Sequence, residues 1–301
     1  MPILLNSLPI FRDNTKDMPL LSVIIPTHNR VDILEQCLAH LEKQTIADNI
    51  EVIVVNDVQD DKFNALSAKT DWQIPIYFET ISPCHQGVAR NHGVQKAQSS
   101  TCLFIGDDIF LKSDVCAVHQ NVHSNHSTPI AVLGKTDWDP NMTITPVMKW
   151  LMQSGWQFGY PQISKYAHGI IPKNMQHQFT YTSHISVPTD IALRTPFNPD
   201  STMYGWEDIE WGMQLRENGV QVFFEPDAMA HHHHMITMKD SLKRMETIGE
   251  SAVIMEQSTP GFDRVPHGIK RIGYEIFSRF PTMAGKHRAA FLRGIKRASI
   301  S

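Results

Sequence analysis

Short apolar runs alternate with helix-like segments between residues 20 and 110, and this alternation most constrains the fold. The predicted strands are residues 20–26, 50–55, 74–78 and 101–110. The predicted helices between them are residues 31–44, 62–69 and 87–97. This order is typical of βαβ units, which place their strands in a parallel sheet of the α/β class. Right-handed crossovers then bring the carboxyl ends of the strands to one edge of the sheet.

Polar residues follow these strands at the edge where open α/β sheets hold their ligands. They are Thr27 and Asn29, then Asp57, then Asp107 and Asp108, with Arg90 on the preceding helix. We therefore expect a nucleotide-binding half. The loop after the first strand, Pro-Thr-His-Asn-Arg, lacks the glycine pattern of a dinucleotide site, and the chain has no P-loop sequence.

Asp107 and Asp108 are adjacent carboxylates that follow the apolar run Thr-Cys-Leu-Phe-Ile. No Lys or Arg stands next to them in the sequence to neutralise them. Two carboxylates held together favour a bound cation, because their mutual repulsion is otherwise costly. Gly-Asp-Asp is also ordinary turn composition, so a simple turn is the alternative.

Five stretches of the chain resemble, in order, the family 2 glycosyltransferases of GT-A fold, and they span about residues 20 to 257. They read LSVIIPTHNRVDILEQCLAHL, EVIVVNDVQDD, GVARNHGV, FIGDDIF and YGWEDIEWGMQLRENG. The resemblance implies a Rossmann-like mixed sheet flanked by helices. It also implies transfer of a sugar from a nucleotide-diphosphate donor, with inversion at the anomeric carbon and with Mn²⁺ or Mg²⁺ as cofactor.

Donor binding is what the resemblance implies for one set of residues, namely Pro26, Thr27, Asn29, Arg30, Asp57, Arg90, Asn91 and Asp107. Thr27, Asn29 and Arg30 would lie in the loop beside the nucleotide, and Asp57 would face the base. Arg90 and Asn91 would lie near the diphosphate. The guanidinium of Arg90 has the fork geometry that phosphate favours, although a surface helix position is its alternative.

The metal site implied by the resemblance combines the Asp pair with a histidine. Asp108 is expected to bind the cation directly, and Asp107 to bind the ribose or a metal-bound water. The family commonly has acidic residues where this chain has Asn56 and Gly106, so fewer carboxylates are present.

Four consecutive histidines at residues 231–234 follow a predicted strand at residues 220–224. The resemblance implies that His232 or His234 completes the metal site. Alternate residues of an extended segment face opposite sides, so His231 and His233 are expected to point elsewhere.

Glu207 and Asp208 open a predicted helix over residues 205–218. Acidic residues in a first turn also favour the helix dipole, which is the alternative explanation. The resemblance implies that both residues belong to the catalytic site, with Asp208 as the general base. Trp206, Gly205 and His184 are expected on the acceptor side.

Further elements are predicted along the second half of the chain. Strands are expected at residues 130–134 and 179–186, and helices at residues 113–126 and 242–255. His119 and His123 have i,i+4 spacing, and a packed or solvated helix face is favoured over a metal pair. Residues 137–177 carry aromatic side chains without clear periodicity, which either stack on an acceptor sugar or fill the core.

The predicted organisation is an N-terminal extension (1–19), a glycosyltransferase domain (20–257) and a basic helical C-terminal segment (258–301). The domain divides into a nucleotide-sugar half (20–136) and an acceptor and metal half (137–257). Basic and apolar residues interleave over residues 264–297. Such a segment either lies on an anionic membrane or caps the domain with a solvated basic face.

Composition narrows the partners and the compartment. The net charge of −4 gives no sign of nucleic-acid binding, and the 4 cysteines, scattered and without a Cys-x-x-Cys pair, favour free thiols. Neither a secretory signal nor a run of about 18 apolar residues is seen. We expect a cytoplasmic enzyme, in peripheral contact with the inner face of the membrane.

The expected activity joins a nucleotide-sugar donor to a glycan or lipid-linked acceptor during the synthesis of surface polysaccharide. Two alternatives belong to other classes. A nucleotidyltransferase would usually show a glycine-rich basic loop after the first strand, where this chain has Pro-Thr-His-Asn-Arg. A non-catalytic sugar-nucleotide-binding module would not need both the Asp107/Asp108 and the Glu207/Asp208 pairs.

Overall fold

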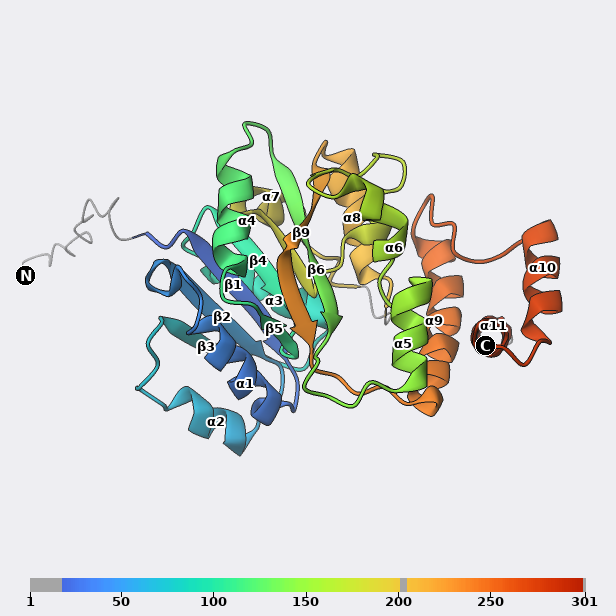
Figure 1. Ribbon diagram of the computed structural model, residues 1–301, viewed down its shortest axis with the longest axis horizontal. Coiled ribbons are helices and arrows are strands. Elements are labelled where there is room, and N and C mark those ends of the chain that lie inside the picture. The colour runs from blue at the N-terminus through green and yellow to red at the C-terminus, as the bar shows by residue number, and fades with distance from the viewer. Residues whose placement is uncertain (1–17, 201–204, 300–301) are drawn as a thin grey trace, which may run out of the picture.

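A computed structural model describes residues 18–200 and 205–299, in which one mixed sheet is flanked by helices (Figure 1). Its strand order is β3-β2-β1-β4-β8-β6-β9-β5, with β7 paired to β9. The strands are β1 Leu21–Thr27, β2 Ile50–Asn56, β3 Ile76–Thr80, β4 Thr101–Ile105, β5 Ile109–Leu111, β6 Ile130–Trp138, β7 Gly169–Ile170, β8 His184–Pro188 and β9 Gln221–His232. Residues 1–17 of the expected N-terminal extension lie outside the described range.

Helices cover both faces of this sheet, and the last helices lie beyond it at one end of the molecule. They are α1 Val31–Leu41, α2 Asp61–Ser67, α3 Gln86–Lys96, α4 Val115–Ser124, α5 Pro146–Ser154, α6 Tyr160–Ile163, α7 Thr189–Arg194, α8 Glu207–Glu217, α9 Met238–Ser258, α10 Gly268–Ser278 and α11 Met283–Ala298. α1 ends three residues before its predicted end at Gln44. α9 is longer at both ends than its predicted range because Thr237 and Asp240 form a capping box that starts it earlier.

The first half of the chain forms the predicted parallel strands. β1 pairs in parallel with β2 and with β4, and β2 pairs in parallel with β3. Every residue of β2 and of β4 is buried, which explains why their sequences are almost continuously apolar. The expected convergence of strand ends is confirmed, since Thr27, Asn56 and Ile105 end three neighbouring strands at one edge.

The second half of the sheet differs more from expectation. The strand predicted at residues 179–186 is shifted, because Gln176–Phe179 is a 3₁₀ turn and β8 begins at His184. β9 continues eight residues beyond its predicted end at Phe224, with a bulge opposite Gly134/Lys135 that lets it stay paired to β6. The single strand predicted at residues 101–110 is divided into β4 and the short strand β5, which pairs antiparallel with the end of β9.

A helix missed by the sequence analysis lies in the aromatic region of residues 137–177. α5 begins where the Thr145 side chain accepts from the backbone N–H of Met148, and Pro146 occupies its first turn. It ends at Gly155, whose φ of 73° is the left-handed cap that glycine provides at no steric cost. These capping signals were present in the sequence, although the apolar periodicity was too short to reveal the helix.

The C-terminal helices fold back onto the sheet domain, as Figure 1 shows at one end of the molecule. α11 packs along α9 with glycines at the contact, because a Cβ at Gly249 would overlap the Phe291 carbonyl and one at Gly294 would overlap the Glu246 carbonyl. α10 lies outermost and has no buried residue. Among the residues described, no helix combines the length and the apolar character needed to cross a membrane.

Candidate active site

A cavity of about 510 Å³ opens at the carboxyl ends of β1 and β2, and we call it the strand-end pocket. Five residues expected to bind the donor line it, namely Pro26, Thr27, Arg30, Asp57 and Asp107. Glu207 of α8 lines the same cavity, although it lies 100 residues or more from all of them in the sequence. The parallel topology therefore brings most of the predicted donor residues to one place.

Asp57 is held on both carboxylate oxygens. His28 Nδ1 lies 2.7 Å from one oxygen, and the backbone N–H of Cys84 donates to the other at 3.2 Å. His28, Cys84, His85 and Gln86 also line the strand-end pocket and were not among the predicted site residues. Their positions directly after β1 and before α3 were the signal that could have found them.

Arg30 neutralises the Asp pair, which corrects the expectation of two uncompensated carboxylates. Its guanidinium lies 2.9 Å from Asp107 Oδ1 and 2.7 Å from Asp108 Oδ2. Thr27 Oγ1 donates a further bond of 2.8 Å to Asp107 Oδ2. Burial raises the pKa of Asp107 to about 6, while the Arg30 charge and the Thr27 bond oppose that rise.

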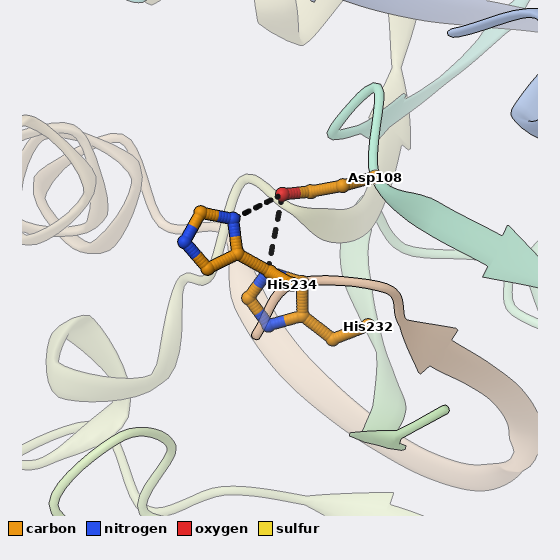
Figure 2. Close-up of side chains that lie close together, drawn as sticks. All are labelled: Asp108, His232 and His234. Carbon is orange, nitrogen blue, oxygen red and sulfur yellow. Dashed lines mark hydrogen bonds and ion pairs between the residues drawn. The ribbon is translucent and has the colours of Figure 1, made fainter. Parts of the chain in front are cut away.

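Asp108 meets two histidines from the other half of the chain (Figure 2). His232 Nε2 and His234 Nδ1 each lie 3.3 Å from Asp108 Oδ2. The pairing of Ile109 with His232 between β5 and β9 fixes this approach, since it places the strand end directly beside the carboxylate. Burial opposes ionisation of Asp108, but the two histidines and Arg30 hold its pKa well below its usual range.

The donor set fits a divalent cation of the first transition row. One carboxylate oxygen and two imidazole nitrogens lie within 4.8 Å of one another, and carboxylate with imidazole suits Mn²⁺. His233 turns away, because its Nδ1 contacts Asp139 Oδ2 at 2.6 Å and its ring stacks on Phe110. His232 and His234 thus face Asp108 while His233 faces the other way, as the alternation of side chains along an extended segment predicts.

Asp208 lies in the first turn of α8, and the loop before β8 holds its carboxylate. The backbone N–H of Thr182 donates to Asp208 Oδ2 at 3.2 Å, and the Thr182 hydroxyl donates to Oδ1. Burial and then the neighbouring charge of Glu207 raise the pKa of Asp208 to about 6, against the influence of Arg90. A carboxylate of this kind is ionised near neutral pH and basic enough to accept a proton.

Arg90 is turned inward, which corrects the surface alternative for this residue, while the role of Asn91 near the diphosphate stays a prediction. Arg90 is 2% exposed, and its Nε and Nη1 have no hydrogen-bond partner in the described protein. Its guanidinium lies 5.7 Å from the Phe197 ring. Burial lowers the pKa of Arg90, and the negative charges of Asp208, Glu207 and Asp107 oppose that lowering. Asn91 exchanges two hydrogen bonds, of 2.7 and 2.9 Å, with the backbone of Phe197.

Asn29 and His184 do not line the strand-end pocket. Asn29 is exposed and has a φ of 53°, a left-handed conformation that Asn tolerates in turns. His184 is fully buried, so the structure corrects its expected place on the acceptor side. Its Nε2 lies 3.1 Å from His119 Nε2, and its Nδ1 lies 3.3 Å from Thr136 Oγ1.

The packed alternative for His119 and His123 is the one observed. His119 Nδ1 and His123 Nε2 each lie 2.8 Å from the hydroxyl of Ser186 on β8, in one buried network with His184. Burial lowers the pKa of His123 and of His184 to about 4 and that of His119 well below its usual value. The network therefore holds its histidines neutral in the folded protein.

We expect this network to destabilise the fold as the pH falls. The unfolded chain takes up protons below about pH 6.5, whereas folded His123 and His184 do so only near pH 4. Each is then expected to cost about 2 kcal/mol of unfolding free energy between pH 7 and pH 5. Urea unfolding at the two pH values measures the loss.

The comparison that isolates His123 is between wild type and His123→Gln, in the change of unfolding free energy from pH 7 to pH 5. Asp107 and Asp208 have raised pKa values, so they gain protons on folding over the same range and act in the opposite direction. Subtracting the variant removes their contribution. A pH dependence that is identical in both proteins would contradict the role given to His123.

Two further cavities lie beyond the Asp108 and Asp208 groups. One, of about 490 Å³, is lined by His232 together with Trp138, Phe158 and Tyr160. The other, of about 330 Å³, is lined by the predicted acceptor-side residues Gly205 and Trp206 and by the guanidinium groups of two arginines. We call it the arginine pocket. Trp138 and Tyr160 line the first of these cavities and are also buried in the core, so the same aromatic residues serve core packing and could stack on an acceptor sugar.

Comparison with known sequences decides the family. A sequence profile described as Glycosyl transferase family 2 matches residues 22–245. The chain belongs to glycosyl transferase family 2. The match includes the Asp107/Asp108 and Glu207/Asp208 pairs and both histidines that meet Asp108, and it ends within α9.

Curated relatives of this family 2 chain carry glycosyltransferase names. The validoxylamine A glucosyltransferase of Streptomyces hygroscopicus subsp. jinggangensis is 25% identical over 226 residues, which are 68% of this chain and 53% of that protein. The poly(ribitol-phosphate) beta-glucosyltransferase of Bacillus spizizenii is 26% identical over 38% of this chain and 19% of its own length. The chain thus spans about half the length, or less, of these relatives.

Solved structures share the GT-A fold. The mannosyltransferase PcManGT from Pyrobaculum calidifontis, in complex with GDP-Man and Mn²⁺, aligns with a TM-score of 0.60 at 17% identity, over 93% of this chain and 76% of that one. Residues 1–349 of S. aureus TarS, in complex with UDP, align with a TM-score of 0.55 at 14% identity, over 93% and 90%. The predicted GT-A architecture with C-terminal helices is confirmed.

Proposed function

We propose that this family 2 protein transfers a sugar from a nucleotide-diphosphate donor to an acceptor hydroxyl, with inversion at the anomeric carbon. One observation carries the proposal. Asp107, the neighbour of Asp108, and Glu207, the neighbour of Asp208, line the same strand-end pocket, which supports one site with the Asp108–His232–His234 group at one end and Asp208 at the other. A single displacement needs this separation, with leaving-group stabilisation on one side and a proton acceptor on the other.

The strand-end pocket is the proposed donor site. Asp57, held by His28 and Cys84, offers a fixed acceptor to a nucleotide base, and Asp107 offers one to the ribose. The complexes of PcManGT with GDP-Man and of TarS with UDP-GlcNAc support a nucleotide-sugar ligand, although both are less than 25% identical to this chain. Arg90, buried with free N–H groups, would contribute positive charge beneath the diphosphate.

Asp108, His232 and His234 would hold the proposed Mn²⁺ or Mg²⁺, and two imidazoles favour Mn²⁺. The cation, when bound, supplies charge neutralisation to the departing diphosphate. Arg30, which already pairs with both carboxylates, would keep Asp107 and Asp108 oriented toward the pocket. Asp208 would take the proton of the acceptor hydroxyl, and Glu207 would hydrogen-bond the acceptor or orient the loop.

Hydrolysis of a panel of UDP-, GDP- and dTDP-sugars, with and without Mn²⁺, tests this function. Slow Mn²⁺-dependent release of a nucleoside diphosphate and free sugar is the expected result. Formation of a nucleotide sugar from a nucleoside triphosphate and a sugar phosphate would instead identify a nucleotidyltransferase. Tight donor binding without any turnover, with and without candidate acceptors, would identify a non-catalytic module.

The proposed biological setting is surface polysaccharide synthesis at the cytoplasmic face of a membrane, with a glycan or lipid-linked acceptor. The name of the poly(ribitol-phosphate) beta-glucosyltransferase relative supports a polymer as the acceptor. We also propose that residues 20–257 form the transferase domain and that residues 258–301, which α9 leads into, form its C-terminal segment.

α10 is the proposed membrane-contacting element. Ile269 is 89% exposed, and Ile272, Ile276, Phe277 and Phe280 are also exposed along the same outer helix and its end. Lys270 and Arg279 are exposed beside them. An apolar stripe flanked by basic residues is the composition that binds anionic membrane surfaces.

Vesicles containing phosphatidylglycerol are expected to bind the protein, and binding should weaken as salt rises, since charges are screened over about 8 Å at 0.15 M. Replacing Ile269 and Ile276 by Asp should abolish sedimentation with the vesicles. Leu193→Asp on α7, which is 52% exposed, is the matched control and should bind normally. Absence of vesicle binding even at low salt would mean that α10 has a purely structural role.

A further inference from the structure

The arginine pocket lies between the sheet domain and the C-terminal helices. Trp156 and Gln157 follow α5, Trp206 precedes α8, Arg244 belongs to α9, and Arg264 follows α9. Tyr274 of α10 and Phe291 of α11 complete one wall. The cavity therefore exists only because segments from across the second half of the chain meet there.

The guanidinium groups of this pocket carry unused hydrogen-bond donors. Arg264 Nε and Nη2 are shielded from solvent and make no hydrogen bond, although Nε lies 3.4 Å from the mostly exposed Asp263. Arg244 donates from Nη1 to Gln157, and its Nε has no partner. Donors that are buried without partners cost free energy unless a ligand completes them.

The charged side chains that line the arginine pocket are all positive. No Asp or Glu is among the described residues that line it, although the chain as a whole has a net charge of −4. A third guanidinium, that of Arg288, lies 5.6 Å from the Trp156 ring and 5.7 Å from the Tyr274 ring, just behind the wall. Positive charge in a concave, partly shielded site attracts an anion strongly.

The arginine pocket also lies next to the candidate base. Tyr181 lines the pocket, and the next residue, Thr182, hydrogen-bonds the Asp208 carboxylate. Trp206 and Ile209 line it from the chain segment that contains Asp208 itself. Glu207, between them, faces the strand-end pocket instead. Asp208 thus lies between the two cavities.

We propose that the arginine pocket binds an anionic acceptor, one that carries a phosphate or carboxylate group close to the hydroxyl that receives the sugar. The inference rests on the proposed function, since it assigns the second substrate of the same site. Arg244 and Arg264 would bind the anion through their guanidinium groups, because a guanidinium fork matches both phosphate and carboxylate. Trp156, Trp206 and Tyr181 line the pocket with aromatic rings of the kind that contact sugars.

Equilibrium binding of glucose 6-phosphate, glucuronate and glucose, measured by ligand-observed NMR on the full chain, tests the inference. Wild type is expected to bind at least one of the two anions about 10-fold or more tightly than glucose. The stronger of the two distinguishes phosphate from carboxylate. The Arg244→Gln/Arg264→Gln double variant should bind all three sugars with equal, weak affinity.

Matched variants keep the result interpretable. Arg194→Gln/Arg293→Gln removes the same charge from two mostly exposed arginines outside the pocket and should retain the preference. Arg244→Lys/Arg264→Lys keeps the charge in the pocket and should retain part of it. Equal binding of glucose and both anions by wild type, or an unchanged preference in the Gln double variant, would overturn the proposal.

Nucleotide-sugar hydrolysis separates this inference from the proposed function. Wild type should hydrolyse the donor, because the proposed donor site is the strand-end pocket, which neither Arg244 nor Arg264 lines. Donor hydrolysis by wild type together with loss of anion preference in the Gln double variant supports the assigned acceptor class. If wild type prefers the anions but hydrolyses no nucleotide sugar, the proposed transferase function is contradicted. The bound anion could then no longer be assigned as an acceptor.

Discussion

Replacing Asp208 by Asn is expected to slow sugar transfer by at least about 100-fold, the lower end of what general-base assistance contributes. Asn keeps the size of the side chain and an oxygen that Thr182 can donate to, but it cannot accept a proton. Donor and metal binding should persist, because Asp208 is not part of the Asp108 group. Transfer rates and nucleotide-sugar dissociation constants, measured on the same preparation, check both halves of the prediction.

The dependence of kcat/KM on pH tests the role of Asp208 as a base in a second way. Because the pKa of Asp208 is raised to about 6, the free enzyme holds an increasing fraction of protonated, inactive base as the pH falls below 6. The kcat/KM of wild type should therefore decline on the acid side of about pH 6 and level off above it. Near-normal turnover by Asp208→Asn would move the role to Glu207, and Glu207→Gln would then be the variant to measure.

Replacing Asp108 by Asn is expected to reduce transfer by about 1,000-fold, equivalent to roughly 4 kcal/mol of transition-state stabilisation. The variant removes the one carboxylate that meets both His232 and His234. Excess EDTA should abolish wild-type activity, and Mn²⁺ should restore it. Full activity in EDTA would show that transfer needs no divalent ion.

The histidine run supplies a matched control for the Asp108 prediction. His232→Gln and His234→Gln should each raise the Mn²⁺ concentration needed for half-maximal activity, by about 10-fold or more. His231→Gln changes the same residue type in the same strand, outside the group that surrounds Asp108, and should leave that concentration unchanged. Equal effects at residues 231 and 232 would argue that the run acts through strand stability and not through a bound ion.

The parts of the site that could be predicted from the sequence are those that depend on strand ends. Thr27, Asp57 and Asp107 each follow a buried strand, and parallel pairing necessarily brings such positions together. Arg30 was predicted to lie near the nucleotide, but not to pair with Asp107 and Asp108, since adjacency along the chain does not report proximity in space.

Other features depend on tertiary packing that leaves little local signal. Asn91 reads as a polar helix residue, yet its amide is used to tether the chain at Phe197, 106 residues away. His184 was expected on the acceptor side, within a strand predicted at residues 179–186, yet β8 is an interior strand of the sheet and buries it against α4. The full length of β9 depends on a bulge that keeps it paired with β6, and the arginine pocket depends on helices whose positions no periodicity defines.

The glycine contacts between α9 and α11 have an evolutionary consequence. They fix the last helices against the domain so closely that Tyr274 and Phe291 become part of a pocket wall, although both lie beyond residues 22–245 that match the family. Mutations in the C-terminal helices can therefore reshape that wall while the strand-end pocket, built from residues 26 to 207, keeps its chemistry. Under the proposed function, changes at the C-terminal end of the gene would alter acceptor choice and leave the proposed donor site intact.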